Sequence, residues 1–282
     1  MIIFIIHQLL FSKKESFKDG NAKPTFEVKD NHNIYDSLYA NMYDSLFHDP
    51  IKIKHEMTEI IRLTDLNNTS IVLDIGSGTG DHLGYLKKSV KCIGMDDSKD
   101  MLQVAKKKYP HIKFQQANAL DTMSFMEGQF SHILMMYFTI YYIEDKYTLF
   151  QNIYRWLKPG GFVAIHLVNK YKFDPIVNAS NPLIMLSPQK YAKKRITTSE
   201  IKFNDYQYKA DFKLNGDKAT FEETIKQDDT KNVRKHIHQL HMESQKNILE
   251  LATNIGLEMV GKIDLVTCQY EYQYIYILKK PS

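Results

Sequence analysis

The sequence predicts an α/β protein in which a mostly parallel sheet lies between two layers of helices. Residues 71–75 form an apolar, β-branched run that is typical of a strand buried on both faces of such a sheet. A glycine-rich turn at residues 76–80 and a helical pattern follow at once, which is the order of a β-α unit. Further strand-like runs, separated by helix-like segments, lie at residues 91–95, 111–115, 130–136 and 162–168.

Length and composition indicate one large globular domain, or one domain with an insertion. The chain has 282 residues, of which 43% are hydrophobic and 25% are charged. Its net charge of +4 is small and is not gathered into one stripe, so we expect no nucleic-acid partner. Cys92 and Cys268 are too few for a disulfide framework, which favours a reducing compartment and a cytoplasmic location.

The first 31 residues are expected to be an apolar tail followed by a polar linker. Residues 1–11 are mostly apolar, but a membrane-spanning helix needs about 20 apolar residues, and a signal peptide needs a cleavage site of small residues. Two interpretations stay open. One is an apolar tail or extra core segment, and the other is a weak membrane-surface anchor at residues 1–12 with Lys13 and Lys14 at its edge.

Two helices are expected between this linker and the central strand. Residues 34–47 place three tyrosines at helical spacing, which predicts an amphipathic helix with an aromatic face. A second helix, residues 51–66, is predicted to begin directly after Pro50.

The spacing of the glycines in the turn excludes the common phosphate-binding loops. A dinucleotide-binding loop has the pattern G-x-G-x-x-G, but here the third glycine is replaced by Asp81, whose carboxylate would repel a pyrophosphate. No Lys-Ser or Lys-Thr pair follows, as a nucleoside-triphosphate loop would require. The turn therefore predicts a ligand with a nucleoside and no phosphate. Asp74, at the carboxyl end of the strand, would face a cationic group of that ligand.

A second carboxylate lies where a nucleoside site needs one. Asp96 ends the next strand, 20 residues beyond Gly76, and α/β nucleoside sites place there the carboxylate that accepts hydrogen bonds from the ribose hydroxyls. Ser98 is a suitable N-cap for the helix that follows.

These segments together resemble the motifs of the class I S-adenosylmethionine-dependent methyltransferases. The resemblance rests on residues 74–80, on residues 94–102, on the sequence Leu-Lys-Pro-Gly-Gly at 157–161 after a helix at residues 144–157, and on a C-terminal helix, Gly-Leu and two strands at residues 243–278. It spans residues 34–280. It implies a Rossmann-like three-layer sandwich with a seven-stranded, mostly parallel sheet whose last strand is antiparallel.

The resemblance also implies a cofactor, S-adenosyl-L-methionine, and a small-molecule acceptor of its methyl group. The cofactor-binding residues would be Tyr43, Asp74, Gly76, Ser77, Gly78, Thr79, Gly80, Asp96, Asp97, Met101, Asn118, Ala119, Met136, Tyr137 and Phe138. Asn118 stands where the family commonly has an acidic residue that accepts from the adenine amino group, and its amide oxygen can still accept.

Four residues are candidates for the acceptor side of this site. They are Tyr39, Tyr141, Tyr142 and His166, of which Tyr141 and His166 are the candidates for a catalytic role. The alternative for the tyrosines is core packing, and the alternative for a lone histidine in a strand is a structural role.

Residues 169–242 interrupt the α/β rhythm and are expected to form an inserted antiparallel β cap over the substrate side. Two alternating segments flank Asn215-Gly216, which predicts a hairpin. The methyltransferase domain would then comprise residues 32–168 and 243–282. In the same insertion, the basic residues 190 and 193–195 are expected to be a solvated face, with an anionic substrate group as the alternative.

Three histidines of the insertion are candidate metal ligands. His236, His238 and His241 lie close in sequence, but in a strand the first two share a face and the third points away. Because neither a cysteine nor an evident carboxylate lies at zinc spacing, we expect packing or substrate contact and no metal.

Two other functions are compatible with parts of this pattern. A catalytically inactive S-adenosylmethionine-binding protein with a regulatory or partner-binding role would explain Asn118 and the apolar N-terminus. A nicotinamide oxidoreductase is opposed by the glycine spacing and by Asp81.

Overall fold

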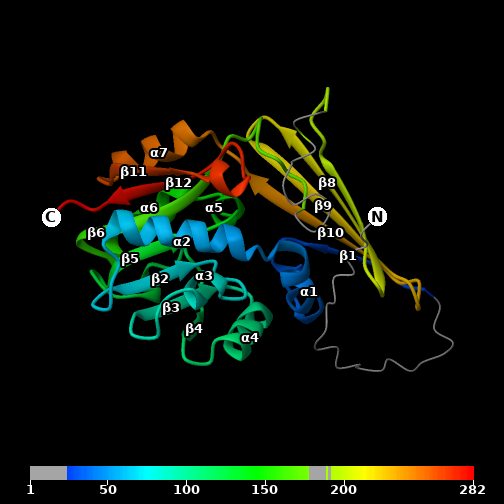
Figure 1. Cartoon of the computed structure of the whole chain (residues 1–282), viewed down its shortest axis with the longest axis horizontal. Helices are drawn as coiled ribbons and strands as arrows, with labels where there is room; N and C mark the ends of the chain where they lie inside the picture. Colours follow the sequence, from blue (N-terminus) through cyan, green and yellow to red (C-terminus); the bar gives the residue numbers. More distant parts are fainter. Residues whose placement is uncertain (1–23, 178–188, 190–191) are drawn as a thin grey trace, which may run out of the picture.

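The computed structural model describes residues 24–177, 189 and 192–282, which form two sheets (Figure 1). The larger sheet contains β2 (Ile71–Ile75), β3 (Lys91–Asp96), β4 (Lys113–Gln116), β5 (Phe130–Met135), β6 (Leu157–Val168), β11 (Glu258–Asp264) and β12 (Gln273–Lys279). Their order across the sheet is β11-β12-β6-β5-β2-β3-β4. The strands from β4 to β6 are parallel, and β12 runs antiparallel to both β6 and β11, so the predicted seven-stranded sheet is confirmed.

Helices cover both faces of this sheet, as in a three-layer sandwich. They are α2 (Pro50–Thr64), α3 (Asp81–Gly84), α4 (Lys99–Lys108), α5 (Thr139–Tyr142), α6 (Lys146–Trp156) and α7 (Gln245–Asn254). Successive residues of β2 point to opposite faces: Val72 packs in the cluster that contains Met57 of α2, whereas Leu73 packs in the cluster that contains Trp156 of α6. Burial on both faces explains why the strands have nearly continuous apolar sequences.

The helix boundaries follow local capping chemistry. Pro50 occupies the first turn of α2, and the carboxylate of Asp49 accepts hydrogen bonds from the backbone N–H groups of the next turn. Ser98 caps α4 as predicted, because its hydroxyl accepts from the backbone N–H of Met101 at 3.1 Å.

The smaller sheet is built mainly from the insertion. Its strands are β1 (Phe26–Asp30), β7 (Thr198–Lys202), β8 (Tyr206–Asn215), β9 (Lys218–Gln227) and β10 (Val233–His241), in the order β1-β10-β9-β8-β7. The predicted hairpin at Asn215-Gly216 joins β8 to β9, and Gly216 has a φ of +60° that suits a glycine. We call this sheet the cap sheet.

The helix α1 (Ser37–Phe47) lies between the two sheets (Figure 1). Its N-cap residue, Asp36, forms an ion pair with Arg234 of the cap sheet, with Oδ2 and Nη2 2.6 Å apart. At its other end, Asp44 accepts a hydrogen bond from the hydroxyl of Thr79 in the glycine turn at 2.6 Å. The helix is therefore attached to both sheets.

Three expectations about the elements need correction. Residues 26–30, placed in a linker, form β1, because they pair in parallel with β10 from Phe26↔Val233 to Asp30↔Ile237. The strand expected at residues 162–168 begins at Leu157, which pairs with Phe130, so the Pro-Gly-Gly sequence lies inside β6. The helix after the glycine turn is a single turn, α3.

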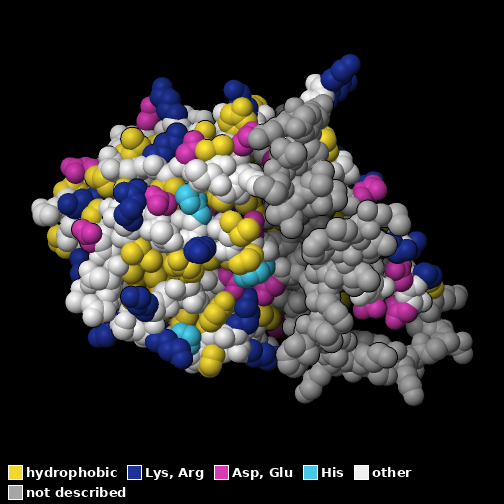
Figure 2. Space-filling view, in the orientation of Figure 1, with side chains coloured by type: hydrophobic (Ala, Val, Ile, Leu, Met, Phe, Trp, Pro, Cys, Tyr) yellow, Lys and Arg dark blue, Asp and Glu magenta, His cyan; other side chains and the backbone are white. Residues whose placement is uncertain are grey.

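The surface agrees with the modest net charge. On the face in Figure 2, basic and acidic side chains of the described part are interspersed. No helix among the described residues is long and apolar enough to cross a membrane. Residues 1–12 and Lys190 lie outside the described residues.

Candidate active site

A cavity of about 700 Å³ lies at the carboxyl ends of β2, β3 and β5, between the larger sheet and the cap sheet. This is the edge at which α/β sheets place their ligands. Its wall includes twelve of the residues expected from the sequence: Tyr39, Tyr43, Gly76, Gly78, Asp96, Asp97, Met101, Asn118, Ala119, Tyr137, Phe138 and Tyr142. Ser77, Thr79 and Met136 line a smaller neighbouring pocket of about 80 Å³.

The glycine turn requires glycine at two positions, because a side chain there would be strained. Gly76 has a φ of +69°, and a Cβ there would lie 2.4 Å from Cγ2 of Thr139. Gly80 has a φ of +86° and is the N-cap of α3. A side chain at either position would displace the backbone that lines the cavity.

Asp96 is held in place by the glycine turn itself. The backbone N–H of Gly78 donates to Oδ2 and the N–H of Ser98 donates to Oδ1, both at 2.9 Å. Burial raises the pKa of Asp96 to about 6. Each carboxylate oxygen keeps a further lone pair, so the group can accept from two hydroxyls of a ligand in the cavity.

Asp74 is buried beneath the turn and lacks a partner. Its side chain is 1% exposed, and neither carboxylate oxygen has a hydrogen-bond partner in the described structure. Burial raises the pKa of Asp74 to about 7. An isolated buried carboxylate is unfavourable, so this position suits a ligand that brings a positive charge to the turn.

Asn118 and Asp97 border the far end of the cavity. Oδ1 of Asn118 already accepts from the backbone N–H of Leu120 at 2.8 Å, which fixes the orientation of the amide. One lone pair of that oxygen remains for a ligand amino group.

A charged cluster beside the glycine turn was not singled out from the sequence. Lys52 of α2 is 3% exposed, lies 2.5 Å from Oε1 of Glu56, and has its Nζ 4.9 Å from the ring centroid of Tyr137. Although burial alone would raise it, Lys52 and His82 hold the pKa of Glu56 at about 2. A lysine four residues before a glutamate is a common surface pattern on helices, so the sequence contained no signal that this pair is buried.

Tyr141 and His166, the two candidates for a catalytic role, are not among the described residues that line the cavity. The hydroxyl of Tyr141 accepts from the backbone N–H of Val168 at 2.8 Å, and both side chains are fully buried. Nδ1 of His166 lies 2.6 Å from the carbonyl oxygen of Tyr137, and Nε2 lies 3.0 Å from the side-chain amide of Gln273, whose NH2 group must face the neutral ring to donate, so neither ring nitrogen is available to an acceptor. Burial lowers the pKa of His166 to about 4, so it is neutral and donates from Nδ1 to that carbonyl.

The hydrogen bond from His166 supports an uncommon backbone conformation at Tyr137. Tyr137 follows β5 with a φ of +53°, an uncommon conformation for a residue with a side chain. The hydrogen bond from His166 holds the Tyr137 carbonyl in that conformation, and the Tyr137 ring faces the cavity. His166 therefore contacts the cavity wall only through the Tyr137 backbone.

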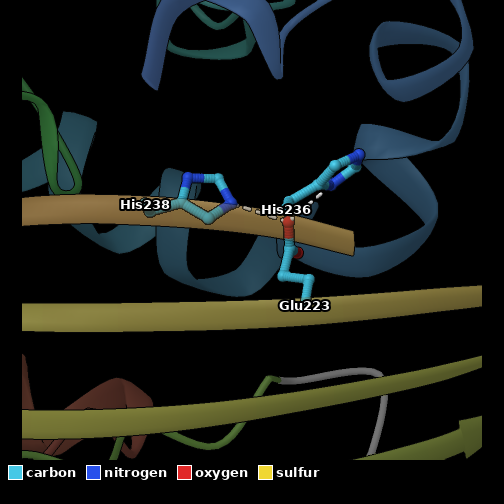
Figure 3. Close-up of side chains that lie close together, drawn as sticks. All are labelled: Glu223, His236 and His238. Carbon is cyan, nitrogen blue, oxygen red and sulfur yellow. Dashed lines mark hydrogen bonds and ion pairs between the residues drawn. The ribbon is translucent and has the colours of Figure 1, made fainter. Parts of the chain in front are cut away.

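Tyr142 does face the cavity and reaches the cap sheet. Its hydroxyl lies 2.8 Å from Nδ1 of His238 on β10. His238 and His236 both contact Glu223 on β9, with distances to Oε2 of 2.7 Å and 3.1 Å (Figure 3). His241 lies on the other side of the strand, with Nδ1 3.6 Å from the carboxylate of Glu144.

Glu223 is the partner that sequence reasoning missed. His236 pairs directly with Glu223 in the β9–β10 register, so their side chains share a face of the cap sheet. That register depends on the length of the loop between the two strands, and sequence spacing alone does not reveal it. The ligand-type atoms of Glu223, His236 and His238 all lie within 4.8 Å of one another.

Comparison with known proteins identifies the central segment. Residues 72–161 match the family model described as a methyltransferase domain. The demethylmenaquinone methyltransferase of Chlorobaculum parvum is 37% identical over 96 residues, which cover 33% of this chain and 39% of that protein. The enzyme of the same name from Oceanobacillus iheyensis is 28% identical over 154 residues, or 51% of this chain and 63% of that protein. The matches thus span less than two thirds of these relatives.

Solved structures extend the similarity to nearly the whole fold. An S-adenosylmethionine-dependent methyltransferase from Clostridium acetobutylicum superposes with a TM-score of 0.65 at 16% identity, covering 87% of this chain and 98% of that one. An amino pentose methyltransferase from Micromonospora echinaspora, solved with S-adenosylmethionine bound, has a TM-score of 0.61 at 13% identity and covers 88% and 98%. At these identities the similarity concerns the fold.

Proposed function

Since residues 72–161 form a methyltransferase domain within a class I S-adenosylmethionine-dependent methyltransferase fold, we propose that this chain transfers a methyl group from S-adenosylmethionine to a small neutral acceptor. The observation that carries the proposal is the pair of carboxylates around the glycine turn. Asp96 is presented to the cavity by two backbone N–H groups, and Asp74 is buried without a partner. A ligand with a ribose and an ammonium group, and without phosphate, satisfies both.

The residues present fit that cofactor along its length. Asp96 would accept from the ribose hydroxyls, and the glycine turn would hold the amino-acid end above Asp74, which is buried beneath the turn and does not line the cavity. The adenine would lie between the remaining cofactor residues of this wall, Asp97, Met101, Asn118 and Ala119. Tyr43 and Tyr137 would flank the cofactor near the reacting centre.

The cofactor supplies a methyl group on a cationic sulfur, which an acceptor displaces in line. The protein contributes alignment and the exclusion of water, which is worth up to ~7–11 kcal/mol when two reactants are held in reacting geometry. Tyr137 and Phe138 form the wall at the carboxyl end of β5, and α1 covers the cavity with Tyr39, Tyr43 and Phe47.

The wall composition argues against an anionic acceptor. No lysine or arginine occurs among the described residues that line the cavity, so they offer no cation to an anionic group. The acceptor half is largely aromatic and aliphatic, with Tyr35, Phe173, Phe212, Phe221 and Leu240, and its polar side chains include Glu144, Asp145 and Asp174. Such a surface suits a ring or an alkyl group.

The first experiment is a calorimetric titration with S-adenosylhomocysteine, with NADH as the control ligand. We expect micromolar binding of the former and none of the latter. Preference for NADH, or no binding of either, would contradict the proposal. A screen of hydroxyl, amine and carbon acceptors with a labelled methyl donor then tests turnover, and binding without transfer to any acceptor would favour a regulatory role.

We also propose a cytoplasmic location, with weak membrane association through residues 1–12 as a separate question. Co-sedimentation of the full chain and of a chain lacking residues 1–20 with vesicles of neutral and anionic lipid tests the second part. Equal sedimentation of the two chains would contradict it.

A further inference from the structure

A single buried carboxylate organises the polar groups between the cap sheet and the cavity. Glu223 is 0% exposed and accepts four hydrogen bonds. The hydroxyls of Tyr39 and Tyr208 lie 2.8 Å and 2.5 Å from Oε1, and rings of His238 and His236 lie 2.7 Å and 3.1 Å from Oε2. Although burial opposes ionisation, the two histidines hold the pKa of Glu223 well below its usual range, so the group is a carboxylate.

The direction of the hydrogen bonds at His236 follows from Arg234. The guanidinium Nε of Arg234 donates to Nε2 of His236 at 2.7 Å, and its Nη2 pairs with Asp36. An arginine can only donate, so Nε2 of His236 is an acceptor and the ring proton lies on Nδ1, facing Glu223.

The direction at His238 is the opposite. Because the Glu223 carboxylate only accepts, Nε2 of His238 donates to it, and in the neutral ring Nδ1 then keeps a lone pair. That lone pair faces the hydroxyl of Tyr142 at 2.8 Å. Tyr142 and His238 both line the cavity, whereas Glu223 does not. The chain of hydrogen bonds therefore runs from the cavity into the cap sheet.

The same geometry opposes a metal ion, although the three ligand atoms are close enough to hold one. A metal on Nδ1 of His236 would place the ring proton on Nε2, directly opposite the N–H of Arg234 at 2.7 Å. Two donors would then face each other, whereas metal-bound histidines direct their second N–H to an acceptor. The hydrogen bonds of the cluster therefore suit proton transfer and not metal binding.

We propose that Tyr142, His238 and Glu223 form a proton relay that takes up the proton lost by an acceptor hydroxyl during methyl transfer; this inference rests on the proposed function. As the acceptor oxygen bonds to the methyl carbon, the carbon–sulfur bond breaks and its electron pair stays on sulfur. The hydroxyl proton passes to the Tyr142 oxygen while the Tyr142 proton passes to Nδ1 of His238. The resulting imidazolium is stabilised by the Glu223 carboxylate until the proton returns to solvent after product release.

This assignment names a substrate class. A neutral amine attacks through its lone pair, but an alcohol or phenol must lose a proton to become a neutral methyl ether, so a relay serves a hydroxyl. Burial raises the pKa of Tyr142 well above its usual range, so Tyr142 is protonated in the resting state and can pass a proton on. With the aromatic wall, the structure assigns an acceptor with a ring-bound hydroxyl.

The groups that face His238 come from every surrounding element. Tyr142 of α5, Glu223 of β9 and His236 of β10 are its polar neighbours. The rings of Tyr35 and Tyr39 lie 6.0 Å and 6.2 Å from the His238 ring. Tyrosines remain neutral near neutral pH, so the ring signals of His238 and His236 are the ones to be followed separately.

The relay can be tested without knowing the acceptor, by NMR of protein labelled with ¹⁵N-histidine. We expect opposite neutral tautomers, Nε2–H at His238 and Nδ1–H at His236, assigned through His238→Gln and His236→Gln. Tyr142→Phe should shift the His238 Nδ1 signal and leave that of His132 unchanged, because His132 bonds to Ser131 and Thr64 elsewhere. An Nδ1–H tautomer at His238, or a cation at neutral pH, would overturn the proposal.

Kinetics and metal analysis complete the test. With an acceptor from the screen, Tyr142→Phe should lower kcat by about 10²–10⁴-fold and leave S-adenosylhomocysteine affinity unchanged. Glu223→Gln should shift the pH profile of kcat, and Glu223→Asp should restore part of the rate. The exposed Tyr147→Phe is the control that keeps wild-type kinetics. Three results would overturn the relay: an unchanged kcat in Tyr142→Phe, methyl transfer to amines alone, or stoichiometric zinc in the purified protein. Absence of S-adenosylhomocysteine binding would instead refute the proposed function.

Discussion

Asp74 and Asp96 end neighbouring strands, and their different surroundings give them different tasks. Both have a pKa raised by burial, yet Asp96 accepts two backbone hydrogen bonds while Asp74 accepts none. A carboxylate with donors already in place is prepared for hydroxyls, and one without partners is prepared for a cation. The two residues therefore allow separate tests.

Asp96→Ala should weaken S-adenosylhomocysteine binding by ~1–3 kcal/mol, because the ribose would lose hydrogen bonds to a charged group. Isothermal calorimetry measures the change. The matched control is Glu258→Ala, an exposed acidic residue on β11. Equal affinity of Asp96→Ala and wild type would remove the ribose assignment.

Asp74→Asn should change the pH dependence of stability in the free protein. The pKa of about 7 in the folded state lies above the unfolded value, so the folded state holds this proton more tightly. Stability is then fully present below about pH 4 and falls as the pH rises through about 7. Asparagine has no such proton.

Urea unfolding at two pH values measures this effect. We expect Asp74→Asn to exceed wild type by up to ~4 kcal/mol near pH 8 and by much less near pH 5. A gap of the same size at both values would show that Asp74 is not the titrating group.

Among the elements, α1 links the glycine turn to the cap sheet and covers the cavity. Asp44 near its C-terminal end bonds to Thr79 and to Lys108, and Asp36 at its start pairs with Arg234. These contacts attach α1 to both sheets over the cavity.

Thr79→Val removes the hydroxyl that holds α1 to the glycine turn and keeps the shape of the side chain. We expect S-adenosylhomocysteine to dissociate faster and stability to fall by ~0.5–1.5 kcal/mol. Stopped-flow fluorescence and urea unfolding measure the two effects. Thr253→Val at the end of α7 is the control, and equal dissociation rates in both variants would refute a covering role for α1.

The strands and the glycine turn could be predicted from the sequence because their signals are local. Residues 71–80 combine an apolar run with glycines whose positive φ the backbone requires. β1 could not be predicted, since its five residues are mostly exposed and its pairing partner is β10, far along the chain. Glu223 was missed for the same reason: its role depends on strand register.

The site residues also divide into those predicted from local spacing and those that depend on tertiary structure. Asp96 follows a motif at fixed spacing and lies in the wall as expected. Tyr141 and Tyr142 are adjacent in sequence, and only the geometry of the short helix α5 turns Tyr142 to the cavity and Tyr141 into the core. A pattern of aromatic residues cannot make that distinction.

At the scale of the whole molecule, the N-terminal segment can be divided by two truncations. Removal of residues 1–20 leaves β1 intact, so we expect unchanged S-adenosylhomocysteine affinity and Tm. Removal of residues 1–31 deletes β1 and exposes the edge of β10, which should lower Tm by about 2–4 °C for each kcal/mol lost. Differential scanning calorimetry compares them, and an equal loss in both would show that the first 20 residues belong to the folded core.

The pairing of β1 with β10 also determines how late during synthesis the fold can be completed. Thr25 donates to Asn232 across 207 residues of chain, so during synthesis the first strand emerges long before its partner exists. Contacts of such high sequence separation form late and slow the folding of the elements that depend on them. The larger sheet can be completed only after β12, which follows its other strands in the sequence, has been synthesised. We therefore expect the nascent chain to acquire its binding cavity only after β12 has left the ribosome.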